Sequence, residues 1–472
     1  MNRPLRHEGS RISRSGTLLL FLAGILLYAL TYTGRYFHDG ALFLRLLEEG
    51  RWVWIHLGYL PAAQTLHLLL RPLGFGEAEH ALAALSVLSA SACLAVLHFW
   101  LRALPGPPGS PFLLCLLAAA TPAFWIGATQ PELHVFSAAG AAAALFLTWR
   151  RPLGRLPSTL LAAFLLLVTH LSGAYLLAVL PFLAVRDLAG REAARAWFRI
   201  ASWTLGCALA LLFLLDRTLG AGAFGGKLGF TLDLLGTGLV RGLEDPSILF
   251  RALAPFGVLG FTGILALFLP RARGEGAPLP SRAALAAGLL PFLVYLLSVS
   301  PEDGQFALPL FPLLVLGTYG IAVPAGRRGR HLLLFLLGLQ AVLGLRAEWR
   351  SARDPDRLWA RAVAARIGPD RTRALVLCRN LNRARRLRKD HGIATLDLPG
   401  ATIQDPALAL DFLDRERRRL EDRGVRVYLD AALLEPSPPA TFPLGLLLRR
   451  RIRGENRKTP VVRYPAPPLE DH

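Results

Sequence analysis

The polar gaps between the apolar segments of this chain alternate between arginine-rich and acid-containing, and this alternation constrains the fold more than any other feature. Apolar segments of roughly membrane-spanning length run from Thr17 to Arg346. Short cytoplasmic loops of membrane proteins retain Lys and Arg, so the arginine-rich gaps are assigned to the cytoplasm. These arginines are Arg3, Arg6, Arg11, Arg14, Arg102, Arg150, Arg151, Arg155, Arg186, Arg191, Arg195, Arg199, Arg271, Arg273, Arg282, Arg327, Arg328 and Arg330.

The remaining gaps then face the exported side of the membrane, and they hold carboxylates. A membrane protein that gathers its carboxylates on one face is expected to carry out its polar chemistry there. These acids are Asp39, Glu48, Glu49, Glu77, Glu79, Glu132, Asp233, Glu244, Asp245, Glu302 and Asp303.

Composition supports a polytopic membrane protein and excludes two other classes. Of the 472 residues, 53% are hydrophobic, which is too apolar for an ordinary soluble protein. The net charge of +20 consists largely of arginines that orient the chain and contact anionic lipid, so nucleic acid is not an expected partner. Three cysteines lie in apolar spans and Cys378 stands alone, so neither a disulfide framework nor a cysteine metal site is expected.

The pattern predicts about eleven transmembrane helices with a cytoplasmic N-terminus and an exported C-terminus. The first apolar run lacks a small-residue cleavage site and is expected to remain as a helix. Arginines flank the stretch between Ser158 and Val185 at both ends, which requires two short helices and a turn near His170, Ser172 and Gly173. The other spans are predicted near 17–34, 80–101, 112–128, 133–149, 198–216, 251–269, 283–299, 305–323 and 331–347.

Two domains are expected, a polytopic membrane domain at 1–349 and a soluble exported α/β domain at 350–472. Residues 350–472 contain 26 Lys and Arg against 16 Asp and Glu, and long domains are exported largely regardless of charge. The tail from Glu435 onward is rich in Pro and basic residues and is expected to be loosely ordered. This domain lacks a Gly-rich phosphate loop, so nucleotide binding is not expected. Strands are predicted at 374–378, 393–398 and 425–430, with helices at 381–391 and 406–423.

The first exported loop, from Arg35 to Glu79, contains the main candidate for catalysis. A short amphipathic helix with Leu42, Phe43, Leu46 and Leu47 on one face, followed by two tryptophans, is expected to lie in the membrane interface. Asp39 precedes it in the run Tyr-Phe-His-Asp-Gly, next to His38. Its carboxylate could take a proton from an acceptor hydroxyl, or it could cap the helix that follows.

Other polar residues on the exported side are candidates for substrate binding, each with a structural alternative. His56 could bind a phosphate or belong to an aromatic anchor. Glu132 and His134 lie in a short turn, where polar groups beside a bilayer usually have partners but could also be solvated. His170 could be a ligand or a helix-packing residue. Glu302 and Gln305 begin a later span, where the acid could instead favour the helix dipole.

At these positions the chain resembles the GT-C superfamily of membrane glycosyltransferases, which use polyprenyl-phosphate-linked sugars. The branch it resembles is the DUF2723-like one, related to protein O-mannosyltransferases. The resemblance covers residues 15–185 best, and the rest mainly by layout. It rests on Asp39, His56 and Pro61, on Thr121-Pro122-Ala123-Phe124-Trp125 followed by Glu132, and on Thr169-His170-Leu171.

The resemblance implies roles for several residues. Asp39 would be the catalytic base or would position the acceptor, Glu132 would shape the same site, and His170, Glu302 and Gln305 would help to hold the lipid donor. Asp39 is followed by Gly40 and Ala41 rather than a second acid, so no metal and no cofactor is expected to be required. Arg35, Arg45 and Arg51 could bind the donor phosphate or reach out to lipid headgroups.

The sequence therefore predicts a glycosyltransferase of the bacterial inner membrane. It would move a sugar from a polyprenyl phosphate to an exported protein, lipid or glycan. A transporter or flippase of lipid-linked sugars and a non-catalytic envelope scaffold are the alternatives. A transporter is expected to show repeated halves, broken helices and ionisable residues near the middle of the membrane, whereas the carboxylates here cluster at the exported ends.

Overall fold

The computed structural model of the chain divides into two compact units, Met1–Ala352 and Arg353–His472, and each is considered by itself. The structure describes residues 10–32, 40–50, 58–104, 109–131, 133–219, 254–268, 282–299, 308–322, 326–352, 355–378, 381–397, 406–434 and 461–463.

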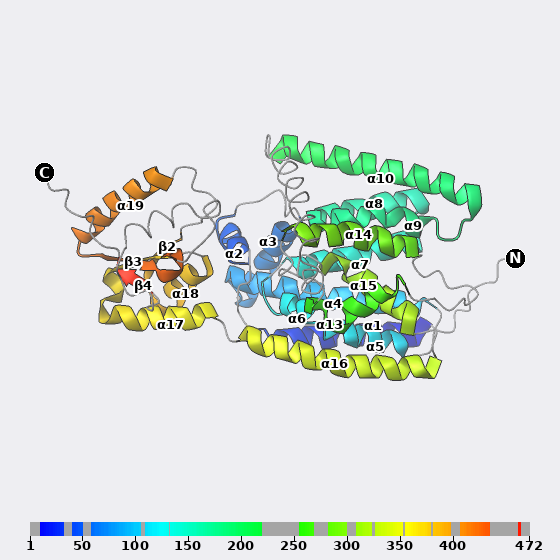
Figure 1. Ribbon diagram of the computed structural model, residues 1–472, viewed down its shortest axis with the longest axis horizontal. Helices are drawn as coiled ribbons and strands as arrows, with labels where there is room; N and C mark the ends of the chain where they lie inside the picture. The colour runs from blue at the N-terminus through cyan, green and yellow to red at the C-terminus, as the bar shows by residue number, and fades with distance from the viewer. Residues whose placement is uncertain are drawn as a thin grey trace. The chain divides into compact units, whose positions relative to one another are not determined.

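The first unit is helical in all its described elements (Figure 1). Helix α10 runs along one edge of the unit and α16 along the opposite edge, while α2 and α3 lie together at one end. Its elements are α1 (Ser10–Leu30), α2 (Gly40–Glu48), α3 (Tyr59–Leu70), η3 (Arg71–Leu73), α4 (Ala78–Arg102), α5 (Ser110–Ala119), α6 (Pro122–Ala128), α7 (His134–Arg150), α8 (Arg155–Thr169), η4 (Leu171–Ala178), α9 (Leu180–Ala184), α10 (Gly190–Leu219), η5 (Ala254–Phe256), α13 (Gly257–Leu265), α14 (Arg282–Val299), α15 (Phe311–Ala322) and α16 (Gly326–Ala352).

Within the described residues, three helices are long and apolar enough to cross a membrane: α4, α10 over Gly190–Leu214, and α16 over Arg327–Arg346. The bent pair α5 and α6 qualifies when it is taken as one span, and further apolar helices are shorter. The chain is thus an integral membrane protein, while the count of eleven spans stays a prediction. Most predicted spans coincide with helices, although α10 begins eight residues earlier than predicted because its first two turns are charged and project beyond the apolar run.

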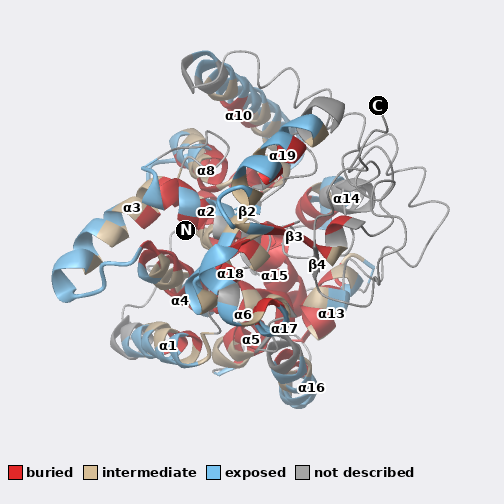
Figure 2. Cartoon of the chain, turned by 90° about the vertical axis from the view of Figure 1, so that its left-hand side faces the viewer, coloured by how far each residue is buried: buried red, intermediate tan, exposed pale blue. Residues whose placement is uncertain are grey.

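Burial separates an inner layer of the first unit from an outer one (Figure 2). Helix α15 is buried along almost its entire length. Helices α1, α10 and α16 instead expose large apolar side chains, which in a membrane protein are the surface that meets lipid. The exposed side chains include Leu22, Leu26 and Leu30 on α1, Phe198, Trp203 and Phe213 on α10, and Phe335, Val342 and Leu345 on α16.

The span predicted at 112–128 is not one helix but two, because α5 and α6 are bent by 69° at the break between them. Pro122 is the first residue of α6. Proline has no N–H to continue the ladder of α5, and it pushes the preceding residue out of the helical region. Accordingly, Thr121 is extended, with φ −68° and ψ 125°.

Side chains from two other helices bind residues at this break. The carbonyl of Ala119 accepts from the hydroxyl of Tyr28 at 3.2 Å. The amide Nε2 of Gln340 donates to Thr121 Oγ1 at 3.0 Å. The indole of Trp125 in turn donates to Thr31 Oγ1 at 3.2 Å. Helices α1 and α16 therefore fix the bend from opposite sides.

Gln340 also holds the start of α13. Its Nε2 donates to the carbonyl of Phe256 at 3.0 Å, and its Oε1 accepts from the N–H of Val258 at 2.8 Å. Gly257 lies between them at φ +53°, where an added Cβ would come within 2.5 Å of Gln340 Oε1. The side chain of Gln340 has no exposed surface. This one buried amide therefore joins the break, η5 and α13.

The stretch from Arg155 to Asp187 folds back on itself, as the arginines at its two ends predict. Helix α8 ends at Thr169, His170 is extended, and η4 and α9 return along α8. The N–H of Gly173 donates to the carbonyl of His170 at 2.9 Å, which closes the turn. At the other end, Arg155 and Asp187 form an ion pair at 3.1 Å.

The second unit is a small α/β unit with the sheet order β2-β1-β3-β4. Strand β1 pairs in parallel with β2 and with β3, while β3 pairs antiparallel with β4. Strand β4 lies in the tail that the sequence predicts to be loosely ordered. The sequence does not predict this strand, because a run of three residues is too short to show an alternating pattern. The elements are α17 (Pro355–Ile367), η8 (Gly368–Arg373), β1 (Ala374–Cys378), α18 (Leu381–His391), β2 (Ala394–Asp397), α19 (Pro406–Glu421), β3 (Arg426–Asp430), η9 (Ala431–Leu434) and β4 (Val461–Arg463).

A buried ion network ties the helices of this unit to its sheet. Arg383 of α18 contacts both carboxylate oxygens of Asp430 at 2.8 and 2.9 Å, and Asp356 of α17 at 3.3 Å. Its guanidinium also lies 4.9 Å from the ring centre of Trp359. Burial alone would lower the pKa of Arg383, but the charges of Asp430 and Asp356 raise it, so the arginine stays ionised.

Replacing Gln340 with leucine is expected to destabilise the first unit. The change leaves the Val258 N–H and the Phe256 carbonyl without their partner in the interior, at about 1–3 kcal/mol for each group. We expect the melting temperature in detergent to fall by roughly 5 °C or more. Gln64→Leu on α3, at a partly exposed position, makes the same chemical change and should have little effect. Equal melting temperatures for the two variants would contradict the role given to Gln340.

Candidate functional site

Two histidines from neighbouring helices meet at one end of the first unit. His134 is the first residue of α7, and His170 follows the last residue of α8 in an extended conformation. Their ring centres are 5.6 Å apart, and the rings are nearly perpendicular. His134 is buried and His170 is partly exposed. The sequence proposes both as substrate-binding residues, and the fold brings them together.

A small residue allows the two helices to approach closely below the histidine pair. Helices α7 and α8 pack against each other. A Cβ added at Gly140 would lie 2.4 to 2.9 Å from three side-chain atoms of Thr169, the residue before His170. Because threonine is branched at Cβ and stiff in a helix, it could not move aside easily. Glycine at position 140 therefore allows Thr169, and with it the neighbouring His170, to lie close to α7.

Aromatic side chains connect the interfacial helices to the histidine pair. The rings of Phe43 and Tyr59 are 5.1 Å apart, and those of Tyr59 and Phe136 are 5.8 Å apart. The N–H of Gly58 donates to the carbonyl of Val168 at 2.8 Å, which anchors the start of α3 on the end of α8. The contacts thus bring α2, the starts of α3 and α7 and the end of α8 together at one end of the unit.

Helix α2 buries an apolar face, although not quite the predicted one. Phe43, Leu46 and Leu47, which the sequence analysis assigns to one face in the membrane interface, are instead buried within the unit, and Leu44 joins them. Leu42 is 40% exposed instead. The difference arises because α2 packs against both α3 and α4, so that its contact face is displaced from the one that a single flat interface would select.

Helix α6 brings a polar turn to the same end. Thr129 and Gln130 follow α6 and are both fully buried. Thr129 Oγ1 donates to the carbonyl of Trp125 at 3.0 Å. A Cβ added at Gly127 would lie 3.2 Å from Leu308, just before α15. The bend between α5 and α6 therefore directs this turn toward the start of α7 and the start of α15.

Most residues that the sequence proposes for the site lie outside the described part of the chain. Some of their described chain neighbours lie next to the helices of the histidine pair: Gly58 contacts α8, and Pro131 and Leu133 precede α7. The residues outside the described ranges are Arg35, His38, Asp39, Arg51, His56, Glu132, Glu302 and Gln305.

Arg45 is described, and it forms an ion pair with Glu49 one turn further along, at 2.8 Å. Both side chains are well exposed, and an exposed pair of this spacing contributes little to stability. The arginine lies near the end of α2, on the helix that packs beside α3. It can therefore exchange this partner for a phosphate at small cost.

Tyr59 and Gln130 are site residues that the sequence analysis passes over. Tyr59 has no exposed surface and lies between Phe43 and Phe136, whereas an aromatic anchor in the membrane interface, one alternative for this segment, would leave the ring at the surface. Gln130 lies two residues before Glu132, the charged residue of this turn that the sequence proposes for the site. An uncharged polar side chain at the edge of an apolar span is the sequence signal that both residues carry.

The described residues contain no group of three or more His, Cys, Asp and Glu side chains arranged to hold a metal ion. Asp39 and Glu132 lie outside the described residues, so the expectation of a metal-free site stays a prediction. What the described arrangement offers chemically is imidazole, hydroxyl and amide groups at the end of a helical bundle. Such groups can donate hydrogen bonds to a phosphate or a sugar.

No protein-family model matches the chain, and no curated protein matches it in sequence. Among solved structures, the archaeal oligosaccharyltransferase AglB from Archaeoglobus fulgidus, in complex with an inhibitory peptide and a dolichol-phosphate, is similar with a TM-score of 0.50. The identity is 11% over 90% of this chain and 70% of that one. ArnT from Cupriavidus metallidurans bound to undecaprenyl phosphate gives a TM-score of 0.47 at 13% identity, over 89% of this chain and 94% of that one. The match to AglB shows a shared fold.

Gly140→Ala is expected to disturb the histidine pair, because the added methyl group would collide with Thr169. We expect a lower melting temperature and greater protease sensitivity at the end of α8. Gly206→Ala on α10 is the matched control, since a Cβ there meets nothing within 4 Å. That control should be neutral or stabilising, because alanine favours a helix by up to about 1 kcal/mol over glycine. Equal behaviour of the two variants would show that the close approach at Gly140 is unimportant.

Proposed function

We propose that this chain, whose fold is shared with an oligosaccharyltransferase, is a membrane glycosyltransferase that transfers a sugar from a polyprenyl-phosphate donor to an exported acceptor. The observation that carries the proposal is the meeting of His134 and His170 at the end of the bundle where the start of α3 contacts α7 and α8. The acceptor would be a protein, a lipid or a glycan, and the sugar a hexose.

A lipid-linked donor explains why such a site belongs at the boundary of the membrane. The polyprenyl chain stays in the bilayer while the sugar and its phosphate reach the aqueous side. Helix α3 and the residues after it expose Leu68, Leu69, Leu73 and Phe75, each more than half exposed, beside the polar end of the bundle. This apolar edge supports a path for the lipid chain next to the proposed site.

In the proposed reaction, the acceptor hydroxyl attacks the anomeric carbon of the sugar. A new bond forms between that oxygen and the carbon, and the bond from the carbon to the phosphate oxygen breaks. The polyprenyl phosphate leaves with the electron pair, and the hydroxyl proton passes to the carboxylate of Asp39. Glu132 would shape the acceptor side of the site. A carboxylate at the edge of the bilayer is suited to this role because partial desolvation raises its basicity.

The leaving phosphate needs hydrogen-bond donors already in place, since negative charge builds up on it as the bond breaks. His134 and His170 supply imidazoles from two helices at this end of the unit. His38, His56 and Arg35 would complete this shell from the first exported loop. Glu302 and Gln305, before α15, would contact the donor sugar.

The test of the proposal is transfer of radiolabelled sugar from a panel of short-chain polyprenyl-phosphate donors in membranes. Asp39→Asn should reduce transfer by about a hundredfold or more, as expected for loss of a general base. His134→Gln and His170→Gln should reduce it by at least tenfold, because each removes a donor to the leaving group. His98→Gln makes the same change in a buried histidine that contacts Thr17 near the other end of the bundle, and it should leave transfer intact.

Two results would contradict this proposal. Equal transfer by the wild type and Asp39→Asn would move the base elsewhere, with Glu132 as the next residue to replace. Absence of transfer from every donor, in a folded protein, would favour a transporter of lipid-linked sugars or a non-catalytic scaffold.

Metal independence is a separate prediction of the proposed chemistry. Because Asp39 stands without a neighbouring acid, the leaving group would be neutralised by imidazole and guanidinium groups rather than by a divalent cation. Transfer should therefore persist in excess EDTA. Loss of transfer in EDTA that magnesium or manganese restores would show that the site needs a metal.

The proposed function also predicts the orientation of the protein in the membrane. We propose a bacterial inner-membrane protein with a cytoplasmic N-terminus and an exported C-terminal unit. Alkaline phosphatase, which folds only after export, should be active when fused to the C-terminus and inactive when fused after Arg151. The opposite pattern would place the histidine pair on the cytoplasmic side and exclude an exported acceptor.

A further inference from the structure

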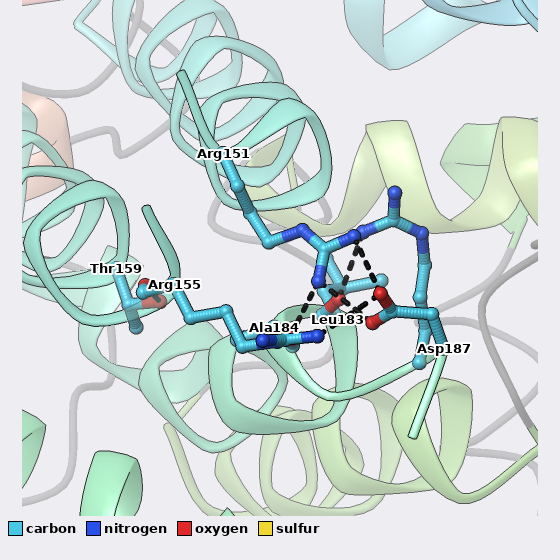
Figure 3. Close-up of polar contacts among 7 residues, drawn as sticks. Arg151, Arg155, Thr159, Leu183, Ala184 and Asp187 are labelled. Atoms are coloured by element: carbon cyan, nitrogen blue, oxygen red, sulfur yellow. Dashed lines mark hydrogen bonds and ion pairs between the residues drawn. The ribbon is translucent and has the colours of Figure 1, made fainter. Parts of the chain in front are cut away.

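A cluster of guanidinium groups lies at the end of α7 opposite to His134 (Figure 3). Arg151 makes a two-pronged contact with Asp187, with distances of 2.7 and 3.2 Å, and also donates to the carbonyl of Ala184 at 3.1 Å. Arg155 reaches the same carboxylate at 3.1 Å. Since α7 has 17 residues, this guanidinium cluster lies about 25 Å from the histidine pair.

Arg186 is the third arginine of the guanidinium cluster. Its guanidinium lies 5.0 Å from the ring centre of Trp149 and donates to the carbonyl of Leu183 at 3.2 Å. The Nε atoms of Arg186 and Arg155 are buried and have no hydrogen-bond partner among the described residues. The cluster therefore holds donors that its own carboxylate and carbonyls do not use.

The guanidinium cluster has an excess of positive charge. Arg151 and Arg155 form ion pairs with a single carboxylate, that of Asp187, and the charge of Arg186 interacts with all three residues. These four side chains therefore carry a net charge of +2. Burial, together with the charges of Arg151 and Arg155, lowers the pKa of Arg186 to about 10, against the opposing effect of Asp187. Crowded, partly buried arginines of this kind are stabilised by an additional anion.

The backbone conformation of Arg151 is a second indication that its side chain has a specific role in the cluster. Its φ is +55°, the left-handed region, and it is the one described residue other than glycine with a positive φ. At the end of a helix this position usually belongs to glycine, because a side chain there is strained. An arginine at this position directs its guanidinium into the cluster.

Exposed apolar side chains continue from the cluster along two adjacent helices. Leu153, Leu161 and Phe164, at the start of α8 and along it, are 60%, 45% and 51% exposed. Phe198 and Trp203 of α10 are 70% and 56% exposed, and α10 packs against α8. A surface that joins a cationic head to an apolar track matches the shape of a phospholipid.

We infer that the guanidinium cluster of Arg151, Arg155 and Arg186 binds the phosphate of an anionic phospholipid, whose acyl chains lie along α8 and α10. Guanidinium groups suit this ligand because they are weakly hydrated and can pair with two phosphate oxygens at once. The net charge of the cluster favours an anionic lipid over a zwitterionic one. This inference is independent of the reaction proposed for the opposite end of the bundle.

The experiment measures lipid retention by native mass spectrometry, and melting temperature, for the purified full-length protein with phosphatidylglycerol or phosphatidylcholine. The wild type should retain and be stabilised by phosphatidylglycerol. The double variant Arg155→Gln/Arg186→Gln should bind it about tenfold or more weakly, since each arginine near a charged headgroup contributes about fivefold. The control Arg327→Gln/Arg330→Gln removes the same charge from exposed positions on α16 and should bind like the wild type.

Asp187→Asn separates lipid binding from a merely structural role of the cluster. Removing the carboxylate frees donors of Arg151 and Arg155 and raises the net charge, so phosphatidylglycerol should bind more tightly even if the lipid-free protein is less stable. This variant decides the matter if the double arginine variant does not fold.

Three outcomes would overturn the inference. They are full retention of phosphatidylglycerol by the double arginine variant, weaker retention by Asp187→Asn, and equal stabilisation by inorganic phosphate alone. The last would identify a site for a free anion, without a role for acyl chains.

Discussion

The first unit depends on how it satisfies the backbone at the bend between α5 and α6. Inside a bilayer there is no water to bind a free carbonyl or N–H, so a broken helix is tolerated only where other protein groups replace the lost bonds. Here Tyr28 donates to the carbonyl of Ala119, and the hydroxyl of Thr121 donates to the carbonyl of Leu117 while it accepts from Gln340. Because these partners come from α1 and α16, the bend also fixes both outer helices against the core.

The bend matters because of where it sends the chain. After the turn, α6 lies between the start of α7 and the start of α15: Gly127 lies close to Val135 and Leu308, and Phe124 stacks on Phe311 at 4.4 Å. The polar turn that follows α6 therefore reaches the end of the bundle where His134 meets His170. A straight helix over the same residues would carry this turn elsewhere. Local chain geometry thus places a polar site at the edge of an otherwise apolar unit.

The two ends of α7 and α8 differ in chemistry, and the length of the helices keeps these ends apart. One end gathers imidazole, hydroxyl and amide groups, while the other gathers Arg151, Arg155 and Asp187. Burial of Asp187 alone would raise its pKa, but the hydrogen bond and charge of Arg151, with the charge of Arg155, hold it below the ordinary range. This carboxylate therefore stays ionised and stabilises the fold at neutral pH, and its contribution disappears only as the pH falls through that lowered pKa.

The sequence by itself determined the class of the protein and much of its local structure. Long apolar runs with arginines in alternate gaps are enough to specify membrane helices, since each depends on composition within one segment. The return of the chain between Arg155 and Asp187 also followed from charge, and so did the strands at 374–378 and 426–430 from their apolar period. Only the tertiary structure decided the bend at Thr121, the role of Gln340 and the contact of Tyr59 with Phe43 and Phe136. Those features depend on partners up to 219 positions away along the chain, and no local pattern records which distant side chain will bind a given polar group.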